Sequence, residues 1–236
     1  MKDSLTIAVP LYNEEDGVLN LYEVLAPIVE KLRLSRMVEI LLVNDGSTDN
    51  TKDLLVKYFS NLPNLKIINH KNNLNLGGFL NTTIKNCNTE LVVFLDSDCT
   101  FHPKYIFEML ELMDSDLDIV NGSPYHPGGK IDGVNKIRLL ISYSCNLIYR
   151  KITKVEAYTF TSIFKMYRLK AIKNIQIENK GFVSVAELFI KSAQQGASVK
   201  EFPCTLSIRQ LGESKIRIVS SIIDHLKLIV QLLRKL

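Results

Sequence analysis

The chain has 236 residues, 46% of them hydrophobic and 23% charged, which predicts one globular α/β domain with a sizeable buried core. Its four cysteines are widely spaced and form no C-x-x-C pair, so a disulfide framework and a zinc knuckle are excluded. The longest uncharged hydrophobic stretch, between Arg138 and Arg150, is about half of the roughly 20 residues that a membrane-spanning helix needs. Because we expect neither a spanning segment nor a secretory signal, we predict a cytoplasmic location.

The first half alternates short hydrophobic runs with helical patterns, which is typical of βαβ units and a mostly parallel sheet. Strands are predicted over residues 4–12, 38–45, 65–70, 90–98 and 117–124. Helices are predicted over residues 14–33, after the turn at 45–51, and after the glycine loop that begins near residue 72. The turn offers three candidate N-caps for the second helix, namely Ser47, Thr48 and Asp49.

The second half is less regular, and we place no domain boundary in it before the C-terminal helix. Its predicted elements are a helix over 132–151, a β-like stretch over 157–168 and a helix over 183–195 that leads to the segment 198–203. From Arg209 onward the basic residues outnumber the acidic ones by six to two, so this segment carries the whole net charge of +4. A basic tail predicts an anionic partner such as a phosphate, a membrane surface or a nucleic acid.

Two carboxylates, Asp96 and Asp98, end the strand predicted over 90–98. The carboxyl ends of parallel strands form the crevice in which open α/β sheets bind ligands. Two like charges at such a place favour a hard cation, Mg²⁺ or Mn²⁺, which keeps coordination positions open for substrate phosphates. The alternative is that Asp96 and Ser97 cap the helix expected near Pro103, while Asp98 is a solvated turn residue.

Polar residues also follow the first two strands, and a glycine pair precedes the third helix. A carboxylate such as Asp45 can accept a hydrogen bond from an N–H of a nucleobase, and glycines let the backbone approach a ligand closely. The residues expected to hold a nucleotide are Pro10, Tyr12, Glu14, Asn44, Asp45, Gly77, Gly78 and Ser97. The dinucleotide fingerprint G-x-G-x-x-G and the P-loop fingerprint are both absent, which argues against those two kinds of site.

In order and spacing, the chain resembles family 2 glycosyltransferases of the GT-A fold through AVPLYNEEDGVLNL, ILLVNDGSTDNT, NLNLGGFLNTTI and VVFLDSD. It is further similar to the dolichyl-phosphate mannose synthase and polyprenyl-phosphate glycosyltransferase branch through NGSPYHPGG, TSIFKMYR, GFVSVAELFIK and EFPCTLSIRQLGESK. The resemblance implies a Rossmann-like GT-A domain over residues 1–217 and a nucleotide-diphosphate donor, a UDP- or GDP-sugar. It also implies that Asp96 and Asp98 hold the metal and that Arg209 and Lys215 hold phosphates.

The resemblance implies an inverting, single in-line displacement with polyprenyl phosphate or another membrane-proximal acceptor. A phosphomonoester is already largely ionised near neutral pH and needs no general base. A hydroxyl acceptor would need one, and Glu187 is the fallback candidate for that catalytic role; its alternative is an ion pair with Lys191 one turn on. Two further readings remain open, a soluble or polysaccharide acceptor in cell-envelope glycan synthesis and, with a poorer match, a nucleotidyltransferase.

Residues 218–236 predict an amphipathic helix with one narrow polar stripe. The apolar arc is wider than packing on a single sheet requires. We expect this helix to lie on an anionic bilayer with Lys227, Arg234 and Lys235 at headgroup level, so that the protein is peripheral at the cytoplasmic face of a membrane. The alternative is a terminal helix buried against a partner subunit in a homo-oligomer.

Overall fold

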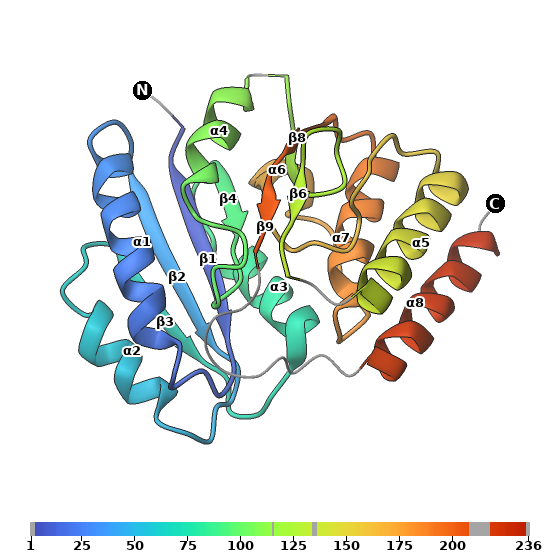
Figure 1. The fold of residues 1–236 in the computed structure, drawn as a ribbon. Coiled ribbons are helices and arrows are strands. Elements are labelled where there is room, and N and C mark those ends of the chain that lie inside the picture. Colours follow the sequence, from blue (N-terminus) through green and yellow to red (C-terminus); the bar gives the residue numbers. More distant parts are fainter. Residues whose placement is uncertain (1–2, 115, 134–135, 208–217, 235–236) are drawn as a thin grey trace.

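The computed structural model describes residues 3–114, 116–133, 136–207 and 218–234, which form a central sheet with helices on both faces (Figure 1). The first half contains β1 (Leu5–Leu11), α1 (Val18–Arg33), β2 (Val38–Asn44), α2 (Thr51–Phe59), β3 (Leu65–Asn69), α3 (Asn75–Asn86), β4 (Leu91–Phe94), α4 (Tyr105–Leu112) and β5 (Ile119–Ser123). The second half contains β6 (Lys130–Ile131), α5 (Lys136–Thr153), β7 (Lys165–Arg168), α6 (Leu169–Ile172), α7 (Val183–Gln194), β8 (Val199–Pro203), β9 (Thr205–Leu206) and α8 (Ile218–Leu233).

Seven strands form the main sheet in the order β3-β2-β1-β4-β7-β5-β8. Only β7 runs antiparallel to its neighbours β4 and β5, which confirms the predicted mostly parallel sheet. β1 is the third strand in this order and pairs in parallel with both β2 and β4, so the strand order reverses there. Crevices that bind ligands form at such reversals, outside the carboxyl ends of the strands. A second sheet consists of the short parallel pair β6 and β9.

The two faces of the sheet bury separate cores because successive side chains of a strand point to opposite faces. In β1, Leu5, Ile7 and Val9 join the core that contains side chains of α1, α2 and α4. Ala8 points to the other face and joins the core that contains side chains of α3, α6 and α7. Both cores extend to the ends of the strands, so the loops that follow the strands stand on a rigid base.

The helices α5 and α8 form an outer layer at the end of the sheet that is opposite to α1 and α2 (Figure 1). Leu228 and Leu232 of α8 are buried in the core that contains α7. The hydroxyl of Tyr149 in α5 lies 2.8 Å from Nδ1 of His225 in α8, which links the two helices. Burial lowers the pKa of His225 to about 4, against an opposing effect of Asp224, so this histidine is neutral at neutral pH. No helix among the described residues is long and apolar enough to cross a membrane.

Several predicted boundaries differ from the structure, among them the strand expected over 90–98, which ends at Phe94. The first helix begins at Val18 and not near Glu14, because the carbonyl of Glu14 accepts the N–H groups of Gly17 and Val18 in a separate turn. The helix expected from 132 begins at Lys136. The β-like stretch 157–168 is a strand only over Lys165–Arg168, since side chains hold the preceding backbone: Asn121 donates to the carbonyl of Thr159, and Asn146 accepts the N–H of Phe160.

Candidate active site

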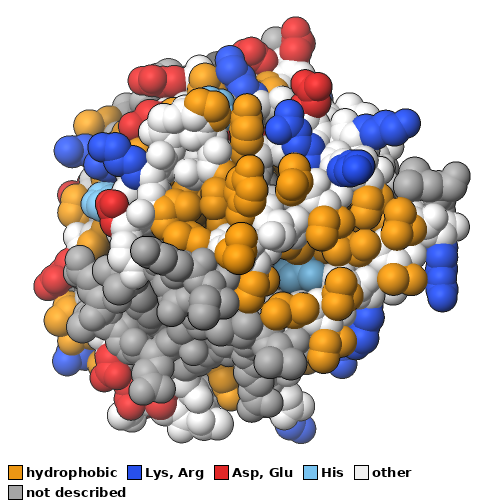
Figure 2. All heavy atoms as spheres, turned by 45° about the vertical axis from the view of Figure 1, so that its right-hand side comes forward, with side chains coloured by type: hydrophobic (Ala, Val, Ile, Leu, Met, Phe, Trp, Pro, Cys, Tyr) orange, Lys and Arg blue, Asp and Glu red, His pale blue; other side chains and the backbone are white. Residues whose placement is uncertain are grey.

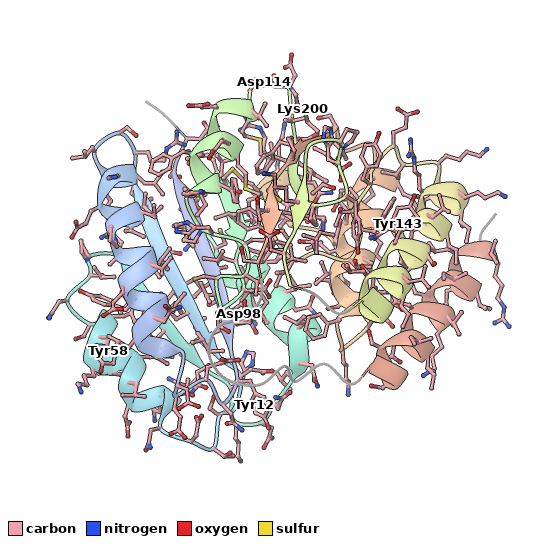
Figure 3. The ribbon with its side chains drawn as sticks, viewed as in Figure 1. Tyr12, Tyr58, Asp98, Asp114, Tyr143 and Lys200 are labelled. Atoms are coloured by element: carbon pink, nitrogen blue, oxygen red, sulfur yellow. The ribbon has the colours of Figure 1, made fainter. Side chains whose placement is uncertain are left out.

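The residues predicted to bind a ligand gather at the carboxyl ends of β1, β2 and β4. In Figure 3, Tyr12 and Asp98 lie toward this edge of the sheet, whereas Asp114 and Lys200 lie toward the opposite edge. The N–H of Leu95 donates to the carbonyl of Ala8, so the chain leaves β4 directly beside the last residues of β1. The fold therefore brings Asp96 and Asp98 next to the loop that carries Tyr12 and Glu14.

The loops after β1 and β2 are joined by side-chain hydrogen bonds. Oδ1 of Asn13, which has a φ of 50°, accepts the N–H of Thr48 at 2.8 Å, and the N–H of Asn13 donates to the hydroxyl of Ser47. The N–H of Glu14 donates to the hydroxyl of Thr51 at the start of α2. These bonds fix Tyr12 and Glu14 relative to the end of β2, which positions groups before any ligand arrives.

The N-cap of α2 was left open among Ser47, Thr48 and Asp49, and this prediction is wrong, because the N-cap residue is Asn50 and it makes no side-chain cap hydrogen bond. Asp49 still supports the start of α2, since its Oδ1 accepts the backbone N–H of Thr51 at 3.0 Å and also the hydroxyl of Thr51. Asp49 also accepts the N–H of Glu15 through Oδ2, so it holds the loop after β1 as well.

The side chain of Asp45 is fixed by the loop that follows β3. Its Oδ1 lies 2.6 Å from Nδ1 of His70 and accepts the N–H of Leu74 at 2.8 Å. Nε2 of His70 lies 2.8 Å from the hydroxyl of Thr82 in α3. Asp45 is only 4% exposed, and it is one of the few buried carboxylates at this edge. Asp45 was predicted from the sequence but His70 was not, and the only signal for His70 is its place as the last residue of a predicted strand.

Asn44 was also predicted to contact the nucleotide, but its amide serves the strand ends. Its Nδ2 donates to Oδ1 of Asn69 in β3 at 2.8 Å, and its Oδ1 accepts the N–H of Ser47 at 3.3 Å. The side chain is buried. Asn44 therefore holds the ends of β2 and β3 together and shapes the turn that presents Asp45.

The glycine pair in α3 has a close neighbour that belongs to the chain itself. The N–H of Gly77 donates to the carbonyl of Lys180 at 2.8 Å, and a Cβ on Gly77 would lie 2.0 Å from the carbonyl oxygen of Asn179. A Cβ on Gly78 would lie 2.2 Å from Cβ of Leu74. Both glycines thus allow close packing at the start of α3. They were predicted to let the backbone approach a ligand, and this packing is a second role that the prediction did not include.

The turn after β4 has a strained backbone that presents Asp98. Cys99 has a φ of 51°, a left-handed conformation that is uncommon for a residue with a Cβ. Its N–H donates to the carbonyl of Asp96, and Oδ1 of Asp98 accepts the N–H of Thr100 at 3.1 Å. The alternative that Asp96 and Ser97 cap the next helix is wrong, because α4 begins at Tyr105 without a side-chain cap.

The charge of this turn fits a cation with oxygen ligands. Burial raises the pKa of the Cys99 thiol to about 12, and the negative charges of Asp98 and Asp96 add to that rise. Carboxylate oxygens suit Mg²⁺ or Mn²⁺. Among the described residues there is no group of three or more histidine, cysteine or acidic side chains that could hold a metal. A metal at Asp96 and Asp98 would therefore need further oxygen ligands from a substrate or from water.

Glu187 is held by structural bonds and is not placed as a catalytic base. One carboxylate oxygen accepts the N–H of Glu178, and the other accepts the N–H of Asn179 and its side-chain amide. Nζ of Lys191 lies 2.6 Å from Oε1, which confirms the alternative of an ion pair. Burial alone would raise the pKa of Glu187, but the hydrogen bonds from Lys191, Asn179 and Glu178 outweigh it and the pKa is lowered.

We expect Glu187→Gln to destabilise the fold by about 1–3 kcal/mol at neutral pH, because the N–H groups that donate to Glu187 and the ammonium group of Lys191 lose an ionised partner. Because the folded-state pKa of Glu187 is lowered, its contribution is present above the ordinary pKa near 4.5 and is lost as the pH falls below it. Urea unfolding of both proteins from pH 7 to pH 3 measures this. Glu178→Gln is the control, because that exposed carboxylate pairs with the same Lys191 and should matter little. Equal losses in both variants would contradict the assignment.

Lys165 is a buried cation that the sequence analysis also missed. It is fully buried in β7, and its Nζ donates to the carbonyls of Phe160 and Ser162. Burial lowers the pKa of Lys165 to about 7, and the negative charges of Glu201 and Asp96 partly offset this effect. Its signal is a lone charge inside the apolar run SIFKMY. Lys165 holds the loop before β7 close behind the carboxylates at the end of β4.

Two predicted phosphate-binding residues, Arg209 and Lys215, lie outside the described residues. Their roles remain predictions. The other predicted site residues come together at one edge of the sheet, except for Glu187, whose contacts are with the loop that precedes α7.

The family model described as "Glycosyl transferase family 2" matches residues 6–176, from β1 to the segment after α6. The chain belongs to glycosyl transferase family 2. The matched part includes Tyr12, Asp45, His70, Asp96 and Asp98, so the whole cluster at the strand ends lies within the family domain. The family assignment agrees with the resemblance that the motifs suggested.

Three relatives with curated names are similar over most of the chain. The chain is 26% identical over 234 residues to "Dolichol-phosphate mannosyltransferase" of Pyrococcus furiosus, which covers 98% of this chain but only 64% of that relative. It is 27% identical over 219 residues to "Polyprenol monophosphomannose synthase" of Mycolicibacterium smegmatis, covering 89% of this chain and 79% of the relative. It is 28% identical over 218 residues to "Undecaprenyl-phosphate mannosyltransferase" of Micrococcus luteus, covering 89% and 86%.

Solved structures of glucosyl-3-phosphoglycerate synthase from Mycobacterium tuberculosis share the fold. The structure in complex with UDP has a TM-score of 0.71 at 15% identity and covers 98% of this chain and 79% of that one. The structure in complex with Mn²⁺, UDP and glucosyl-3-phosphoglycerate has a TM-score of 0.70 at 14% identity and covers 98% and 78%. These similarities confirm the predicted GT-A arrangement of a mostly parallel sheet flanked by helices.

Proposed function

We propose that this chain transfers a sugar from a nucleotide-diphosphate donor to a polyprenyl phosphate at a membrane surface. The observation that carries the proposal is the gathering of Asp45, Asp96 and Asp98 at the carboxyl ends of β2 and β4, the two strands that flank β1, in a family 2 domain. In this proposal Asp45 receives the base. Asp96 and Asp98 would hold a divalent cation, which when bound would neutralise charge on the leaving diphosphate.

The contacts of Glu187 favour a phosphate acceptor over a hydroxyl acceptor. A hydroxyl acceptor requires a general base near the attacking oxygen, and Glu187 was the one candidate that the sequence named. Because Glu187 is bound by an ion pair and three N–H groups, it is unsuited to that role. A phosphate acceptor is already ionised and needs orientation by cations, for which Arg209 and Lys215 are the proposed groups. The names of the three relatives support the same acceptor class.

The proposal is tested by offering the full chain a labelled UDP- or GDP-sugar with Mn²⁺ and three acceptors. These are a polyprenyl phosphate, the same polyprenol without phosphate, and a soluble oligosaccharide. We expect label in the organic phase only with the polyprenyl phosphate. Transfer to the oligosaccharide instead would establish the alternative of a soluble or polysaccharide acceptor, and no transfer from either donor would overturn the proposal.

The membrane part of the proposal rests on an exposed apolar face shared by α5 and α8, here called the α5/α8 face. Its members are half exposed although they are hydrophobic, and they are Leu140, Tyr143, Leu147, Ile148, Ile223, Leu226, Val230 and Leu233. Figure 2 shows hydrophobic side chains gathered on this side of the molecule with Lys and Arg side chains toward its edge. Exposed apolar patches of this kind mark contact surfaces, and basic residues at the rim suit an anionic bilayer.

The packing of α8 determines which of its residues are exposed and available for the proposed contact. Leu228 and Leu232 point into the core, so deletion of the helix would expose buried surface and test folding as well as binding. The opposite side of α8, with Leu226 and Leu233, remains exposed. Point substitutions on that side are therefore the sharper test.

We expect Leu147→Glu combined with Leu226→Glu to abolish flotation of the protein with vesicles that contain phosphatidylglycerol. Each residue is about half exposed, at 55% and 53%, so neither substitution removes core packing. Val56→Glu on α2 is the matched control, since Val56 is 51% exposed at the other end of the molecule. If the double variant still floats, or if the unaltered chain never floats, the α5/α8 face is not the membrane contact. Dimers that dissociate in the double variant would assign the face to a partner subunit.

A further inference from the structure

We infer that the donor base is uracil and not guanine, because Asp45 offers one free carboxylate oxygen and not two. This inference rests on the proposed function, since it concerns the base of the same nucleotide donor. It separates the two donor classes, UDP-sugars and GDP-sugars, that the sequence left open.

One oxygen of Asp45 is fully used by the protein. An ionised carboxylate only accepts hydrogen bonds, and each of its oxygens has two lone pairs. Oδ1 has Nδ1 of His70 at 2.6 Å and the backbone N of Leu74 at 2.8 Å, so both of its lone pairs are engaged. His70 must donate from Nδ1 in this contact, and the hydroxyl of Thr82 at Nε2 keeps the ring in that orientation.

The other oxygen of Asp45 remains for a ligand. Within the described part of the chain, Oδ2 makes no hydrogen bond. It is also not among the fully buried polar atoms without a partner, so solvent or a ligand reaches it. Asp45 therefore presents a single acceptor atom at the end of β2.

The protein backbone closes the side on which Oδ1 lies. Gly46 has a φ of 72°, and a Cβ there would lie 2.6 Å from the carbonyl carbon of Asn72. The turn after Asp45 is thus packed tightly against the loop that supplies His70 and Leu74. A base cannot reach Oδ1 by displacing this loop without breaking the contacts of His70, Leu74 and Gly46 together.

The two bases differ in what they present to a carboxylate. Uracil has one imide N–H, which needs one acceptor atom. Guanine has a ring N–H beside an amino group, a pair of donors that a carboxylate binds with both oxygens. At Asp45 the two donors of guanine would have to share Oδ2, and the bent geometry of two hydrogen bonds to one oxygen weakens both of them. We expect UDP to bind at least about tenfold more tightly than GDP.

The test is isothermal titration of the full chain with UDP and with GDP in the presence of Mn²⁺. Tighter binding of UDP by about tenfold or more supports the inference. Equal or tighter binding of GDP overturns the inference and leaves the proposed function standing. Binding of neither nucleotide overturns the proposed function itself, so the two failures are distinguishable.

Two substitutions of His70 test whether it sets this preference. The amide of asparagine lies where Nδ1 of histidine lies, so His70→Asn can still donate to Asp45, whereas the longer amide of His70→Gln reaches toward Thr82. We expect His70→Gln to narrow the ratio of UDP to GDP affinity several-fold, and His70→Asn to narrow it less. Melting temperatures show that both variants are folded. If the ratio of UDP to GDP affinity is unchanged in His70→Gln, His70 does not set the preference for the base. The ratio measured for the unaltered chain still decides between uracil and guanine.

Discussion

Sugar transfer by the Asp98→Asn variant is expected to fall at least about a hundredfold, and the same loss is expected for Asp96→Asn. The physical reason is that a divalent cation contributes several kcal/mol by neutralising a leaving diphosphate, and each 1.4 kcal/mol is about a factor of ten in rate. Asparagine retains Oδ1, which in Asp98 accepts the N–H of Thr100, so the turn should keep its shape. The measurement is the rate of transfer at saturating Mn²⁺ together with the melting temperature.

Asp53→Asn is the control for this experiment, because Asp53 is an exposed acid in the first turn of α2. It removes the same charge and should leave transfer within about twofold. Retention of more than about a tenth of the metal-dependent rate in both Asp96→Asn and Asp98→Asn would contradict the assignment of these carboxylates.

Gly77→Ala is expected to destabilise the fold by about 3 kcal/mol and to weaken nucleotide binding. A Cβ at this position would lie 2.0 Å from the carbonyl oxygen of Asn179, a backbone atom that cannot rotate away. Alanine is more favourable than glycine inside a helix by about 1 kcal/mol, so the cost of the clash must exceed this gain in helix propensity. Nucleotide binding should suffer because the start of α3 also carries Leu74, whose N–H holds Asp45.

Gly17→Ala is the matched control for Gly77→Ala. A Cβ on Gly17 would have only ordinary contacts, at 3.5 Å from Oε2 of Glu14 and 3.6 Å from its carbonyl oxygen. Urea unfolding should therefore show little change for Gly17→Ala. A Gly77→Ala variant as stable as the unaltered chain would show that the contact with Asn179 is not a fixed part of the fold.

The strands and the polar residues at their ends could be predicted because both follow from local patterns. β1, β2 and β3 are hydrophobic runs bounded by polar turns, and each lies within one residue of its predicted bounds. The βαβ pattern predicted parallel strands, and the carboxyl ends of parallel strands meet at one edge. Asp45, Asp96 and Asp98 were found in this way, without any knowledge of their contacts.

The contacts that support these residues could not be predicted, because they join segments far apart in the chain. Glu187 was named as a base, but its partners in the loop 178–179 appear only when that loop folds back onto α7. Gly77 packs against Asn179, about a hundred residues later, and no local pattern indicates that approach. The stretch 157–164 has strand-like composition, yet Asn121, Asn146 and Glu201 hold its backbone in an irregular path.

The most direct test of the central claim is a crystal of the chain grown with UDP and Mn²⁺ and measured at the manganese absorption edge. We expect an anomalous peak beside Asp98 and the diphosphate, and the imide N–H of uracil within hydrogen-bond distance of Oδ2 of Asp45. A hollow of about 650 Å³, lined by Asp3, Arg168 and Lys170, lies at the opposite edge of the sheet. Nucleotide bound in that hollow, with no manganese at Asp96 and Asp98, would contradict the account.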